Sequence, residues 1–228
     1  MFNFFIDFTT EYNLLLYFLS YPTGNSPEER AIQYKIPNEV SLQVRDGTDN
    51  GNALKRFLEK RYSDNEKKLK EFVDYASGLD YSEYLARLSR IFGYDFPDYK
   101  IRINTNHAGT SDWTGTDGVS LRFDFDQSEW MHYILWETIL SQTFQLVRKM
   151  PEAKDFPDMD SDNSGKSVWG MAEITAWVIT ELSDDFHFKK HIIGYPQLVK
   201  YGDSAAKLYS ERADFYDYLG KLVDFFKE

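Results

Sequence analysis

The strongest constraint on the fold is a pair of short segments whose residues alternate between apolar and polar. Tyr99 to Asn104 (YKIRIN) and Val119 to Phe125 (VSLRFDF) both follow this pattern, which is typical of half-buried β-strands. The loop between them is rich in Gly, Thr, Asp and Asn. Helical periodicity dominates most of the remaining chain. Together these patterns predict a helix-rich α+β fold, in which a short twisted sheet lies among helices.

Before the strands, residues 1–95 are expected to form a mainly helical N-terminal region. Apolar side chains from Phe5 to Leu19 recur at helical intervals and predict an amphipathic helix that faces the core. A short strand is expected over residues 36–44. Further helices are predicted over about 53–61, 64–77 and 81–92, and the last of these ends at Gly93.

After the strands, a long amphipathic helix over about 128–149 and another over 167–182 complete a core of residues 96–182. Residues 183–228 are expected to form C-terminal helices that pack on this core, with a final helix over about 204–226. All five tryptophans lie between positions 113 and 177. Large aromatic rings gathered in one region predict a compact subdomain that is packed partly from rings.

Composition excludes several classes of function. The chain of 228 residues carries a net charge of -11 and contains no cysteine, which excludes disulfide frameworks, thiolate metal sites and cysteine nucleophiles. The negative charge disfavours binding to nucleic acid or to an anionic membrane surface. Asp7 and Glu11 interrupt the apolar N-terminus, which lacks a basic segment and a cleavage site. We therefore expect a cytoplasmic protein.

Each of the two helices predicted in the 96–182 core contains one glutamate that is a candidate functional residue. Glu137 lies in the long helix, within the segment Trp136-Glu137-Thr138-Ile139-Leu140, and Glu173 lies in the following helix, within Ala172-Glu173-Ile174-Thr175-Ala176-Trp177. The order of elements is strand, glycine-containing loop, strand, long helix, acidic loop and helix. With these two segments, residues 96–182 resemble the zincin-like core of the gluzincin-type zinc metallopeptidases.

In that family the long helix carries His-Glu-x-x-His, which places two zinc-binding imidazoles on one helical face and a general base between them. The resemblance places Glu137 at the general-base position and Glu173 at the position of the third metal ligand. Trp136 and Leu140 occupy the positions of the two histidines. Neither side chain coordinates zinc, and a catalytic zinc site needs three protein ligands. The resemblance therefore implies a catalytically inactive relative that binds no metal and no other cofactor.

An inactive relative would keep the cleft as a groove for a peptide or protein segment. The resemblance implies walls formed by Trp113, Trp136 and Trp169, with His107 of the loop between the strands at the border of the cleft. His132 precedes Trp136 by one helical turn and is expected beside the altered site. An edge strand in such a cleft could receive an extended peptide by main-chain pairing.

A metal-dependent hydrolase with displaced ligands is an alternative function. His132, Glu137 and Glu173 could then hold zinc or another divalent ion. His187 and His191 form a second candidate, because two histidines four residues apart share one face if the segment is helical.

A third interpretation involves no relation to peptidases. Trp136 and Leu140 would then be ordinary core residues of a helix, and Glu137 would be exposed or paired with a basic side chain. The protein would be a helical interaction protein.

Overall fold

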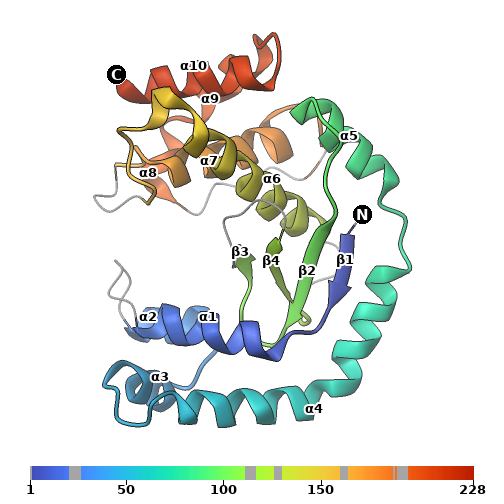
Figure 1. Cartoon of the computed structure of the whole chain (residues 1–228), viewed down its shortest axis with the longest axis vertical. Helices are drawn as coiled ribbons and strands as arrows, with labels where there is room; N and C mark the ends of the chain where they lie inside the picture. The colour runs from blue at the N-terminus through green and yellow to red at the C-terminus, as the bar shows by residue number, and fades with distance from the viewer. Residues whose placement is uncertain are drawn as a thin grey trace.

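The computed structural model describes residues 2–20, 27–110, 117–125, 130–159, 164–186, 188 and 195–228. Figure 1 shows a small sheet at the centre, with α6 and α7 above it and α1 to α3 below it in this view. The coarse prediction of a helix-rich α+β fold is confirmed. No helix in these described ranges is both long enough and apolar enough to cross a membrane.

The sheet contains four described strands: β1 (Phe2–Phe5), β2 (Tyr99–Asn104), β3 (Gly109–Thr110) and β4 (Asp117–Arg122). Their spatial order is β1-β2-β4-β3, in which β1, β2 and β4 are parallel and β3 runs antiparallel to β4 at one edge. Both segments with alternating residues thus form strands, as predicted. Phe5 was expected in the first helix, and this was wrong: the helix begins at Phe8, and Phe2–Phe5 form a strand that was not predicted.

The N-terminal helices are α1 (Phe8–Ser20), α2 (Pro27–Gln33), α3 (Asn38–Arg45), α4 (Asn52–Ser77) and α5 (Ser82–Phe92). The strand expected over 36–44 is wrong, because the helix α3 covers these residues and buries Ser41 and Val44, which lie on one helical face. Gly93 ends α5 in a left-handed conformation with φ of 78°, as expected.

The helices predicted over 53–61 and 64–77 are one continuous helix, α4. Asp64, at the predicted boundary between them, lies inside α4 and forms an ion pair of 2.6 Å with Lys60 one turn away. The first half of α4 buries Leu54 and Leu58 in a small cluster with α1 and α3, and its second half buries Leu69 and other residues against the sheet. One helix therefore connects two apolar clusters.

The remaining helices are α6 (Trp130–Lys149), a 3-10 turn (Pro151–Ala153), α7 (Val168–Trp177), a π-helical turn (Val178–Leu182), α8 (Pro196–Val199), α9 (Gly202–Ser210) and α10 (Phe215–Lys227). The single helix predicted over 204–226 is wrong. A break separates α9 from α10, where Asp214 caps α10 by accepting a hydrogen bond of 2.8 Å from the backbone N–H of Asp217.

The larger apolar cluster includes residues from Phe2 in β1 to Phe226 in α10. All three predicted regions of the chain contribute to it, because Leu69 and Phe92 belong to the first region, Ile101 to the second and Phe226 to the third. The division of the chain after residues 95 and 182 stays a prediction. The sheet and α6 with α7 form the part of this cluster that positions the candidate site.

Candidate functional site

Two packed helices, α6 and α7, bring the candidate residues together. All residues of α7 except Trp169 are buried. Ser167 begins the helix by accepting a hydrogen bond of 2.9 Å from the N–H of Gly170. Gly170 must lack a side chain, because a Cβ atom there would lie 2.0 Å from the carbonyl oxygen of Gly165. This tight start fixes the axial position of Glu173, which lies one turn further along α7.

Glu173 is buried between the two helices, with 5% of its surface exposed. The indole N–H of Trp136 on α6 donates a hydrogen bond of 3.0 Å to Oε2 of Glu173. The indole of Trp169, one turn before Glu173 on α7, also donates to this carboxylate. Two tryptophans, one from each helix, therefore hold the Glu173 side chain in place.

The two carboxylates named in the sequence come close enough to interact. Burial and the negative charge of Glu137 together raise the pKa of Glu173 to about 8, although the hydrogen bonds from Trp136 and Trp169 act in the opposite direction. Glu173 is therefore mostly protonated and neutral at pH 7. A buried pair of carboxylates lowers its repulsion in this way, by holding a proton.

Tyrosines surround the pair. The hydroxyl of Tyr133, one turn before Glu137 on α6, forms a hydrogen bond with Glu137, and burial together with this carboxylate raises the pKa of Tyr133 well above its usual value. Tyr195 packs edge-to-face on Trp169, with ring centroids 4.7 Å apart. Burial raises the pKa of Tyr195, and the charges of Glu173 and Glu137 contribute. The site is thus two acids beside several aromatic rings, of which Tyr195 is 41% exposed.

The positions that the resemblance assigns to histidines hold apolar or aromatic groups that fill space. Leu140 is buried with 2% of its surface exposed, and Trp136 is partly buried and occupied by its bond to Glu173. Within the described ranges of the chain, no three side chains of His, Asp or Glu lie close enough together to hold a metal ion.

His132 lies beside the pair but interacts with a different acid. Its Nε2 lies 3.1 Å from Oε1 of Glu181, which is buried in the π-helical turn that follows α7. The imidazole stacks on Phe188 at 4.8 Å and meets the ring of Trp136 edge-on at 5.9 Å. Turns of π-helix frequently occur at functional sites, and this one directs Glu181 toward α6.

His107 is buried in the loop after β2, with 1% of its surface exposed. Its imidazole stacks on Phe18 of α1 and on Tyr34, with ring centroids 5.6 and 5.9 Å away. Burial lowers the pKa of His107 to about 3, and the positive charge of Arg102 adds to this shift. The imidazole is therefore neutral at pH 7.

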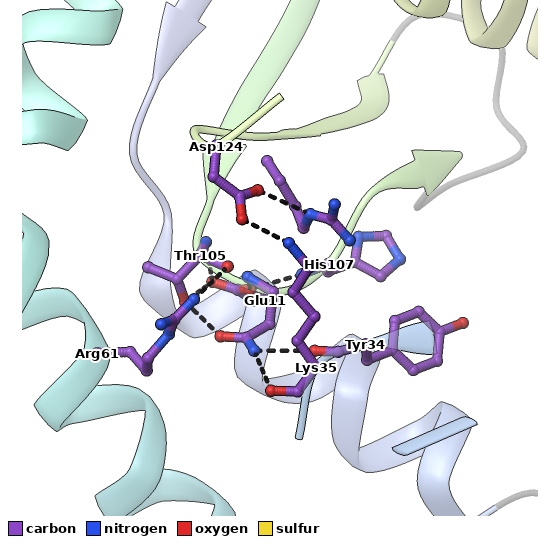
Figure 2. A network of polar contacts seen from close by, with 9 residues as sticks. Glu11, Tyr34, Lys35, Arg61, Thr105, His107 and Asp124 are labelled. Atoms are coloured by element: carbon purple, nitrogen blue, oxygen red, sulfur yellow. Dashed lines mark hydrogen bonds and ion pairs between the residues drawn. The ribbon is translucent and has the colours of Figure 1, made fainter. Parts of the chain in front are cut away.

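The structure also contains a buried polar centre that sequence reasoning missed (Figure 2). Glu11 of α1 is fully buried, and its carboxylate accepts hydrogen bonds from the backbone N–H groups of Thr105, Asn106 and His107 at 3.1, 2.5 and 2.7 Å. The hydroxyl of Tyr62 donates to the same carboxylate at 2.6 Å. The sequence hint of this polar centre was Glu11 itself, an acidic residue among the apolar residues of the first helix.

Three residues of the predicted site, Trp113, His187 and His191, lie outside the described residues. Six of the predicted residues lie on the two packed helices of the site. They are Trp136, Glu137, Leu140 and His132 on α6, and Trp169 and Glu173 on α7.

No protein-family model matches the chain, no curated protein matches it, and no solved structure matches its fold. The chemistry of the site therefore has to be argued from its own residues.

Proposed function

We propose that this protein is a catalytically inactive relative of the gluzincin-type zinc metallopeptidases, and that its cleft holds a peptide or protein segment. The observation that carries this proposal is the convergence of Glu137 and Glu173 from two packed helices, with the indole of Trp136 bonded to Glu173. These carboxylates occupy the positions that the resemblance gives to a general base and a metal ligand.

The same contact supports the absence of zinc chemistry. A metal-binding carboxylate must present a charged oxygen to the ion, but Oε2 of Glu173 accepts a hydrogen bond from Trp136, and burial favours the protonated form. Leu140 offers no lone pair at the second histidine position. The proposed activity is therefore binding, without a cofactor.

The sheet supports the proposed mode of binding. β3 lies at one edge of the sheet, is antiparallel to β4 and contacts α6, which carries Trp136 and Glu137. An edge strand presents unpaired main-chain groups, to which an extended peptide can add by β-augmentation. Partly exposed rings beside the carboxylates, such as that of Trp169, would then contact peptide side chains.

The kinship is tested by restoring the missing ligands. We expect the double substitution Trp136→His and Leu140→His to create a site that binds one zinc ion per chain, because residues four apart share a helical face directed at Glu173. Zinc content after dialysis, measured by mass spectrometry, is the readout. A third substitution, Glu173→Gln, should abolish the binding. A folded double variant without stoichiometric zinc contradicts the kinship.

The binding function is tested with a display library of random 12-residue peptides selected on the wild-type protein. Enriched peptides should lose at least tenfold in affinity when Trp169→Ala is introduced, and should bind normally to the surface variant Lys67→Gln. N-methylation of alternate peptide amides should block binding in one register only, since a main-chain pair uses every second amide. Equal binding to all variants, or no enrichment, would argue against a peptide groove.

A further inference from the structure

Three fully enclosed polar side chains near the centre of the sheet have unsatisfied hydrogen-bonding atoms. They are both amide atoms of Asn104 at the end of β2, the hydroxyl of Ser120 in β4 and Nδ1 of His107. Asn104 and Ser120 are 0% exposed and His107 is 1% exposed. Buried polar groups in folded proteins nearly always have a partner. Among the described residues these four atoms have no partner, which indicates that water or a bound group completes them.

Strand pairing places these groups on one face of the sheet. Arg102 of β2 is opposite Ser120 of β4, and Asn104 lies two residues beyond Arg102, so the three side chains point to the same side. The intervening residues Ile101 and Ile103 point to the other side, into the cluster that includes α6. The polar face is thus separate from the Glu137 and Glu173 pair.

His107 follows this face at the end of β2. Its backbone N–H is held by Glu11, as Figure 2 shows, and the charge of Arg102 acts on its imidazole. A neutral imidazole carries one hydrogen atom, and in the tautomer that places it on Nδ1 this nitrogen is a donor. Asn104 and Ser120 can donate as well.

The charge of this face is positive, against the balance of the whole chain. The Arg102 side chain is 8% exposed, and Asp7 lies 3.7 Å from it. A solvent-accessible hollow of about 610 Å³ reaches Arg102, and its lining includes Lys100 and one acid, Asp7. The hollow opens on the same side of β1 and β2 as the polar face, and Arg102 belongs to both.

We propose that this face is a binding site for a small oxyanion, namely a phosphate or carboxylate group. Each unsatisfied side chain can donate a hydrogen bond, none of them is an acid, and a guanidinium lies beside them. Such a set of donors matches the oxygens of an anion and repels a cation. The oxygen of Asn104 could accept from the hydroxyl of a protonated phosphate.

The proposal is tested by thermal unfolding of the full chain in sodium phosphate or sodium acetate, with sodium chloride at matched ionic strength as control. Occupancy should raise the Tm with the logarithm of the oxyanion concentration, by roughly 5–10 °C at 100 times Kd for a chain of this size. A response to phosphate alone identifies a phosphate group, and a response to both identifies any oxyanion. No shift beyond that of chloride would overturn the proposal and indicate ordered water.

Single substitutions show where phosphate binds when it raises the Tm. Ser120→Ala removes one donor with little change of volume and should weaken the phosphate response at least fivefold in apparent Kd, as should Asn104→Ala. Ser204→Ala, an exposed position in α9, should leave it unchanged. Arg90→Gln serves as a charge control, because Arg90 and Arg212 line a different hollow beside α5 and α10. A wild-type response in Ser120→Ala, or its loss in Arg90→Gln, would refute the assigned location.

Discussion

The protonation of Glu173 makes a quantitative prediction about stability. The pKa of this carboxyl is about 8 in the folded chain and 4.5 as an ordinary glutamate. Between these two pH values the folded state binds a proton that the unfolded state releases. The contribution of Glu173 to the free energy of unfolding is therefore fully present below pH 4.5 and is lost as the pH rises through 8.

Each pH unit in this window corresponds to about 1.4 kcal/mol. Over the whole interval between the two pKa values the loss is roughly 5 kcal/mol, and from pH 5.5 to 7.5 it is roughly 3 kcal/mol. Glu173→Gln removes the titrating group. Its amide oxygen can still accept from Trp136, and any lost hydrogen bond adds an offset that does not depend on pH.

We therefore expect the stability of Glu173→Gln relative to wild type to increase by roughly 3 kcal/mol between pH 5.5 and 7.5. Urea unfolding followed by tryptophan fluorescence, in steps of half a pH unit, measures this slope. Glu59→Gln, an exposed position in α4, is the matched control and should show no slope. A flat difference for Glu173→Gln would mean that the carboxyl titrates normally, and the account of a buried acid pair would be refuted.

Two further predictions concern the fold. Glu11→Ala should destabilise the protein by about 3–5 kcal/mol, because it leaves three buried backbone N–H groups without an acceptor. Chemical unfolding measures this loss of stability. A loss no larger than that of the exposed control Glu39→Ala would contradict the prediction. Gly202→Ala should cost about 1–3 kcal/mol, since its Cβ would lie 2.4 Å from the ring of Trp177. Gly220→Ala should instead stabilise by about 0.5–1 kcal/mol, because nothing lies within 4 Å of its Cβ. If calorimetry showed that both glycine variants are stabilised, or that both are destabilised, the packing described at Gly202 would be contradicted.

Local patterns were reliable wherever the deciding interactions are local. The alternation in Tyr99 to Asn104 predicted β2. When one face of a strand is more buried than the other, apolar residues recur at every second position, and this period is visible in the strand's own residues. The stop at Gly93 was predicted because glycine readily ends helices, and the predicted start near 167 agrees with the cap observed at Ser167; both depend only on the adjacent turn.

Local patterns failed where the partner is distant in the chain. Phe2 to Phe5 form a strand because β2, almost a hundred residues away, supplies the main-chain partners, and a strand of four residues leaves too short a pattern to distinguish it from the helix that follows. A strand was expected over residues 36–44, but residues 38–45 form a helix that buries Ser41 and Val44 on one face. Packing against other helices overrides such weak propensities.

The candidate site divides in the same way. The sequence by itself determined that Glu137 and Glu173 lie on two helices and that an indole and an isobutyl group flank the first, because residue identity and helical spacing are local properties. Only the tertiary structure decided that Trp136 bonds to Glu173, that Glu11 holds the loop of His107, and that Asn104 and Ser120 share a buried face. These contacts join elements far apart in the chain, and their strength comes from removal from water, which no stretch of sequence specifies alone.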